Sequence, residues 1–280
     1  MTNVQNMPQP AIAHRCLYDV CVAQTQRESD RAILVGLGDR VEAAGTAYAA
    51  AASSGGLAGV APIQLNDDEE RLVVPLYDNR LVAKTGSGRW AYHRIRNSAA
   101  YCPYCTFGEV YEVDHFLHQA GYRELNICPA NLVPICHACN HIKLALIPEA
   151  ADRYLIHPYF DLLPDVRWLF ADLERESGGP VLQYRVNLDE LVYGDLARRL
   201  AYHFETLELD RRFRVRASKV LVEIEDDLAD KAQLLGPARL AEHFRSEADR
   251  HFRIHGNSLE AAGYLAAAES PAFCEGNFGN

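Results

Sequence analysis

The chain of 280 residues lacks several features that would assign it to a class at once. No apolar run approaches the roughly 18 residues of a membrane span, so we expect no transmembrane segment. The N-terminal stretch MTNVQNMPQPAIAHRC has neither a basic region nor an apolar core, which argues against a signal peptide. We therefore expect a cytoplasmic protein without a membrane partner.

Positive charge is also scarce. The sequence has 28 Lys and Arg against 38 Asp and Glu, a formal net charge of −10. Because nucleic-acid binding rests on local neutralisation of phosphates, this balance excludes a protein that coats nucleic acid through bulk attraction. The segment 84–143 differs, since its basic residues outnumber its acidic ones: Lys84, Arg89, Arg94, Arg96, Arg123 and Lys143 against Glu109, Glu112, Asp114 and Glu124. This fits a local nucleic-acid site on an acidic protein.

Eight cysteines are present, and in the cytoplasm cysteines more often bind metal than form disulfides. Four of them form two C-x-x-C pairs, Cys102-Pro-Tyr-Cys105 and Cys136-His-Ala-Cys139. Each tight turn brings two thiolates to one ion, and two turns complete the tetrahedron of a structural zinc. The alternative is two unrelated buried turns. We expect the remaining cysteines to be small buried apolar residues: Cys16, Cys21, Cys128 and Cys274.

Polar side chains lie between and beside the two cysteine pairs. The residues from Glu109 to His115 alternate like a strand that ends in Asp114 and His115. Asn131 begins the stretch that leads into the second pair, and Asn140 opens a helix. A strand end beside a helix start can bring Asp114 and Asn140 together as oxygen ligands of a hard cation such as Mg²⁺. His115 then faces away from the metal and can take a proton from water.

These residues resemble the HNH endonuclease family, the ββα-metal nucleases. The family pattern is present as CPYC at 102–105, VDHF at 113–116 and NLVPICHACNHIK at 131–143. By this resemblance His115 is the general base, Asp114 and Asn140 hold a catalytic Mg²⁺ or Mn²⁺, and Asn131 orients the hairpin that bears the histidine. The zinc ligands are Cys102, Cys105, Cys136 and Cys139. The resemblance implies hydrolysis of phosphodiester bonds in DNA.

Contacts with nucleic acid are expected at four basic residues. Lys143 matches the basic residue on the metal helix of the family, and His141 is placed for a phosphate or surface contact. Arg94 and Arg96 belong to the basic and aromatic segment 89–96, which can grip nucleic acid through arginine and stacking rings. A half-buried helix with solvated arginines is the alternative for that segment.

A looser resemblance extends beyond the core, to one bacterial HNH group with a His-Pro-Tyr-Phe-Asp stretch downstream, here 157–161. Where that group often has Asp-His-Phe-Leu-Pro-Lys, this chain has His118 and Gln119 in the last two places, so one basic substrate contact is missing. Stand-alone members resemble nuclease subunits of bacterial anti-phage systems such as Septu, which implies a defence or restriction role with a partner ATPase or another subunit. The rival hypothesis is a zinc-stabilised nucleic-acid-binding or scaffold subunit with an unused nuclease site.

The fold class that follows is α+β and predominantly α-helical. We expect a ββα-metal core with zinc knuckles at 98–148, an N-terminal helical region at 1–97 and a C-terminal helical region at 149–280. Apolar residues at steps of three and four predict helices, and alternation predicts a strand at 181–186. The residues that carry the helical pattern are Leu34, Leu37, Val41, Ala44 and Tyr48, then Leu196, Leu200, Phe204 and Leu207, then Leu221, Ile224 and Leu228, with further helices over 238–253 and 258–269.

Overall fold

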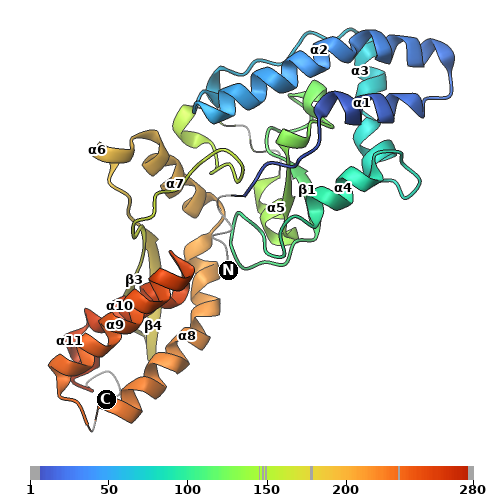
Figure 1. Cartoon of the computed structure of the whole chain (residues 1–280). Helices are drawn as coiled ribbons and strands as arrows, with labels where there is room; N and C mark the ends of the chain where they lie inside the picture. Colours follow the sequence, from blue (N-terminus) through green and yellow to red (C-terminus); the bar gives the residue numbers. More distant parts are fainter. Residues whose placement is uncertain are drawn as a thin grey trace. The chain divides into compact units, whose positions relative to one another are not determined.

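The computed structural model describes residues 7–144, 146, 148, 150–176, 179–232 and 234–276. The chain forms two compact units, an N-terminal unit that ends at Leu163 and a C-terminal unit that begins at Pro164. Both units combine helices with one two-stranded antiparallel sheet, which confirms the α+β class with a helical majority (Figure 1). Among the described residues no helix is long and apolar enough to cross a membrane.

The helices of the N-terminal unit follow the apolar pattern of the sequence. The face predicted from Leu34 to Tyr48 is buried on one long helix, with Ala44 half-buried. Residues 24–27 separate this helix from a shorter one before it, and the two helices pack against each other. A capping box at Asn66 begins a third helix, because its side chain accepts from the Glu69 backbone N–H. The helices are α1 (His14–Ala23), α2 (Glu28–Ser53), α3 (Asp67–Val73), α4 (Arg89–Arg96) and α5 (His137–Lys143).

A short hairpin lies at the centre of the N-terminal unit. It joins β1 (Glu112–His115) to β2 (Leu132–Ile135), with His115 opposite Leu132. Because side chains alternate along a strand, Glu112 and Asp114 share one face while Val113 belongs to the opposite one. Val113 packs in one core cluster with side chains of α1, α2 and α4. The expected boundaries at 97/98 and 148/149 thus fall inside this unit.

The C-terminal unit places helices against its own hairpin. The strand predicted at 181–186 is present as β4 (Gly179–Val186), and it pairs with β3 (Leu169–Glu176). Gly263 permits a close helix packing, since a Cβ there would come within 2.9 Å of Val220 and 3.0 Å of Leu182. The helices are α6 (Glu190–Tyr193), α7 (Asp195–Thr206), α8 (Leu209–Lys231), α9 (Pro237–His255), α10 (Leu259–Ala268) and α11 (Pro271–Cys274).

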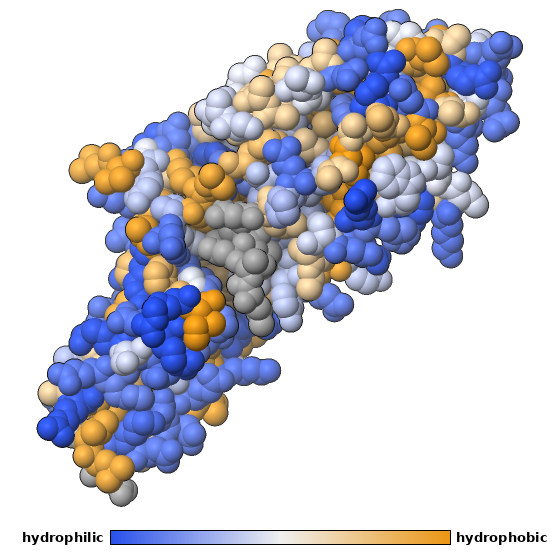
Figure 2. Space-filling model, in the orientation of Figure 1, coloured by the Kyte–Doolittle hydropathy of each residue, from blue (hydrophilic) through white to orange (hydrophobic). Residues whose placement is uncertain are grey.

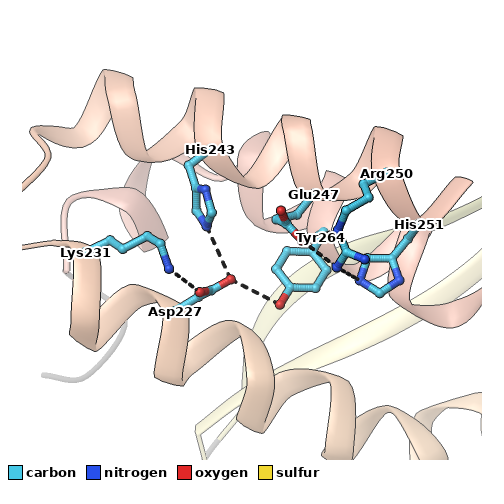
Figure 3. Close-up of polar contacts among 7 residues, drawn as sticks. All are labelled: Asp227, Lys231, His243, Glu247, Arg250, His251 and Tyr264. Carbon is cyan, nitrogen blue, oxygen red and sulfur yellow. Dashed lines mark hydrogen bonds and ion pairs between the residues drawn. The ribbon is translucent and has the colours of Figure 1, made fainter. Parts of the chain in front are cut away.

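Polar residues also join the helices of the C-terminal unit. Asp227 of α8 accepts hydrogen bonds from Lys231, from His243 of α9 and from Tyr264 of α10 (Figure 3). The His251 ring stacks on Tyr264 with 5.4 Å between centroids. Away from this cluster, Figure 2 shows an apolar patch over α6, where Leu191 and Val192 are exposed.

Candidate functional site

The four cysteines of the two C-x-x-C pairs come together as predicted. All are buried, and their sulfur atoms lie within 4.8 Å of one another. The Sγ atoms of Cys105 and Cys136 are 3.8 Å apart. Ligands of a tetrahedral zinc with Zn–S bonds of about 2.3 Å have sulfurs separated by about 3.8 Å. The cluster could therefore hold a structural zinc, and the alternative of two unrelated turns is wrong.

Backbone amides shape both cysteine turns. The Gly108 N–H donates to Cys105 Sγ at 3.3 Å, and the Cys139 N–H donates to Cys136 Sγ at 3.4 Å. Position 108 requires glycine because its backbone lies close to Cys136, and a Cβ there would be 2.7 Å from Cys136 Sγ. These contacts leave little freedom for the sulfurs to separate.

The other cysteines lie apart from the metal cluster. Cys21, Cys128 and Cys274 are buried as expected, whereas Cys16 is exposed. Burial raises the pKa of the Cys128 thiol to about 12, which keeps it protonated and unreactive. The expectation for Cys16 was wrong because its position on α1 faces away from the α1–α2 contact, where Leu17 and Cys21 are buried.

A cavity of about 480 Å³ lies where the end of β1, the loop after it and α5 meet. It contains two of the expected metal ligands, the expected base and three further histidines. Its lining residues are Asp114, His115, His118, Gln119, Ala120, His137, Asn140, His141, Lys143 and Leu144. The structure thus brings Asp114, His115 and Asn140 to one opening, as the sequence predicted.

His115 is held in one orientation beneath this cavity. The residue is 6% exposed, and its Nε2 lies 2.7 Å from the backbone carbonyl of Asn126. Since a carbonyl can only accept, Nε2 carries the proton and Nδ1 keeps a lone pair. The Tyr77 ring packs against the imidazole at 4.5 Å between centroids, and its hydroxyl donates to the Val113 carbonyl. Burial lowers the pKa of His115, although the Asn126 hydrogen bond opposes this, so the ring is neutral near pH 7.

Asp114 is paired with the lysine of α5. The Lys143 ammonium lies 2.7 Å from Asp114 Oδ2 and 2.7 Å from the His115 carbonyl, and it is 4% exposed. These two contacts engage two of the three ammonium hydrogens. A contact between Lys143 and phosphate stays a prediction. In this arrangement the buried Lys143 ammonium compensates the negative charge of the Asp114 carboxylate.

Glu112 joins the strand to α5. One of its carboxylate oxygens accepts from the Asn140 amide at 2.5 Å, and the other accepts from His137 Nδ1 at 2.8 Å. The sequence-based prediction did not include Glu112, His118 or His137. A signal existed for Glu112, because it lies two residues before Asp114 and must share its strand face.

Asn131 and the downstream segment support the hairpin. The Asn131 side chain accepts from the Leu117 N–H at 2.8 Å and donates to the Leu117 carbonyl at 3.1 Å. The Tyr159 hydroxyl donates to the Leu132 carbonyl at 2.8 Å. His157 is fully buried, stacks on Phe116 and contacts the Tyr48 hydroxyl. These contacts fix the loop and the strand that flank His115.

The remaining basic residues are placed differently. His141 is exposed and lines the cavity. Arg94 is exposed on α4, and Arg96 lines a separate hollow with Tyr101 and Glu109. The structure therefore does not bring the two arginines into the cavity that contains Asp114. Their contact with nucleic acid stays a prediction.

The geometry defines a mostly helical α+β protein with a four-cysteine cluster and a cavity lined by an aspartate, an asparagine and a buried histidine. A protein named ea31 from Escherichia phage lambda is 30% identical over 154 residues, which is 53% of this chain and 52% of that protein. The chain thus spans about half the length of the relative that it matches. No family model and no solved structure match the chain.

Proposed function

We propose that the N-terminal unit is an HNH-type endonuclease that hydrolyses phosphodiester bonds of DNA with a divalent metal. The observation that carries this proposal is a neutral His115 whose Nδ1 is left to accept a proton, at a cavity that Asp114 and Asn140 also line. General base catalysis needs an unprotonated group near working pH, and burial provides that state for His115.

The donor set fits Mg²⁺ or Mn²⁺. Asp114 offers a carboxylate oxygen besides the one paired with Lys143, and Asn140 offers an amide oxygen. Hard divalent cations prefer such oxygen ligands. A metal held there would stabilise negative charge that grows on the phosphate and the leaving oxygen. The four-cysteine cluster has a different part in this proposal, since a closed thiolate site stabilises the fold and does no chemistry.

The charge of the protein favours a partner subunit. A chain with a net charge of −10 repels DNA at long range, so a nuclease of this charge benefits from a partner that delivers the substrate. The resemblance to nuclease subunits of anti-phage systems favours an ATPase or another defence subunit as that partner, and we propose that the protein acts in the cytoplasm in defence against phage. The alternative is a zinc-stabilised binding or scaffold subunit with an unused site, and the three intact residues of the cavity disfavour it.

A cleavage assay tests the proposal. Supercoiled plasmid and single-stranded DNA are incubated with the full chain and Mg²⁺ or Mn²⁺, alone and with the products of adjoining genes. We expect nicked or linear product that EDTA prevents. An intact substrate under all of these conditions would favour the binding subunit.

A further inference from the structure

Glu112 is a carboxylate beside the proposed metal site, and the proposed chemistry gives it no part. It lies on β1 two residues before Asp114, so both side chains project from the same face of the strand toward α5. Both of its oxygens are engaged by α5, one by Asn140 and one by His137. No position of the family pattern in this sequence includes it.

The hydrogen bond between Glu112 and Asn140 determines the orientation of the Asn140 side-chain amide. A carboxylate has no proton to donate, so the atom of Asn140 that approaches it must be the NH₂ nitrogen. The amide oxygen is bonded to the same carbon and therefore points away from Glu112. Without such a partner, an asparagine side chain can present either its oxygen or its nitrogen to a cation. A nitrogen that carries two protons cannot bind a metal ion.

We infer that Glu112 is a positioning residue, which turns the amide oxygen of Asn140 toward the divalent metal by holding its NH₂ group. This inference rests on the proposed function, and it names the residue that makes Asn140 a competent ligand. The second contact holds Glu112 in turn, although the His137 side chain is 81% exposed and the pair contributes little energy by itself. Glu112 therefore acts through its hydrogen bond with Asn140.

Mn²⁺ binding to the full chain, measured by isothermal titration calorimetry, tests this inference without DNA. Glu112→Ala should weaken Mn²⁺ binding by about 10- to 100-fold, as removal of a ligand's hydrogen-bond partner does elsewhere. Glu112→Gln should stay within a few-fold of wild type, because its amide oxygen can still accept from Asn140. Glu109→Ala is the matched control, since Glu109 is exposed and lines the other hollow. Zinc content and circular dichroism show that each variant is folded.

A second variant separates orientation from general damage. An aspartate at position 140 has two equivalent oxygens and needs no orienting partner. Asn140→Asp in the Glu112→Ala background should therefore recover affinity relative to Glu112→Ala alone. Equal Mn²⁺ affinity in wild type and Glu112→Ala would overturn the inference and leave the proposed function standing. A loss in Glu112→Gln as large as in Glu112→Ala would overturn it too, because charge or direct ligation would then be the cause. A wild-type protein that binds no Mn²⁺ would remove both proposals.

Discussion

The two units of this protein contain the same combination of side chains and use it differently. In the N-terminal unit Asp114 pairs with Lys143, and His115 packs against a tyrosine. In the C-terminal unit Asp227 pairs with Lys231, and a histidine stacks on a tyrosine (Figure 3). Aspartate, lysine, histidine and tyrosine therefore do not define a site by themselves.

The difference lies in where the partners come from. The groups around Asp227 belong to three helices: Lys231 lies one turn away on α8 itself, while His243 and Tyr264 tie α8 to α9 and α10. Burial would raise the pKa of Asp227, but hydrogen bonds from Lys231 and His243 outweigh it and lower that pKa. Asp114 and His115 are instead adjacent at the end of one strand, and both line a cavity of about 480 Å³. The first arrangement stabilises packing, and the second leaves room for a ligand.

The largest effect should come from the cysteine cluster, which the C-terminal unit lacks among its described residues. Cys102→Ser removes one of four thiolates, and loss of a structural zinc removes folding free energy of the order of 10 kcal/mol. We expect loss of bound zinc and unfolding of the N-terminal unit, while helices of the C-terminal unit persist. Elemental analysis and circular dichroism measure both. The control is Cys16→Ser, which changes an exposed thiol outside the cluster; full zinc content in Cys102→Ser would contradict the account.

A smaller effect is expected from Asn131. This side chain is fully buried and satisfies both backbone groups of Leu117. Asn131→Ala leaves those groups unpaired away from water, which costs about 3 kcal/mol. Urea denaturation measures the change in the free energy of unfolding. Asn97→Ala is the control, because Asn97 is exposed at the end of α4; a similar small loss in both variants would show that the Asn131 contacts do not hold the hairpin.

The third effect is the pH dependence of stability that the His14 ring of α1 should cause. Neither ring nitrogen of His14 has a hydrogen-bond partner among the described residues, and the ring lies against Gly45, where a Cβ would come within 2.2 Å of Nδ1. Burial lowers the pKa of His14 from 6.5 to about 4. The folded state therefore binds its proton later than the unfolded state as pH falls, so stability is present above pH 6.5 and decreases toward pH 4.

The decrease that His14 causes between pH 7 and pH 5 should be about 2 kcal/mol. Urea denaturation of wild type and His14→Leu at both pH values measures it, and the variant should lose less stability than wild type. His93→Leu is the control, because it removes an exposed histidine. Identical pH dependence in wild type and His14→Leu would show that the His14 ring is not buried in the folded protein.

The sequence predicted what depends on short spacings. The zinc ligands follow from two C-x-x-C turns, and the buried face of α2 follows from apolar residues at helical steps. The α3 cap is equally local, because it joins Asn66 to Glu69 three residues later. Each cysteine turn, the α2 face and the α3 cap are fixed by residues within a few positions of one another, whereas the meeting of the two turns joins Cys105 to Cys136, 31 residues later.

The sequence does not predict the features that depend on tertiary contacts. β3 was not predicted because half of its side chains are exposed and its outer end is charged, so that it lacks an apolar alternation. The Asn126 carbonyl that holds His115 belongs to a loop, and no sequence pattern marks a backbone oxygen. Tyr77 reaches His115 from a segment 38 residues earlier, which only the packing of the core determines.

The most direct test compares one histidine from each cluster in the same cleavage assay. His115→Ala should abolish metal-dependent plasmid cleavage while zinc content and circular dichroism stay as in wild type. His243→Ala removes a contact to Asp227, and it should retain cleavage while losing about 1 kcal/mol of stability. Cleavage by His115→Ala at the wild-type rate would contradict the central claim that the cavity beside the cysteine cluster performs the chemistry.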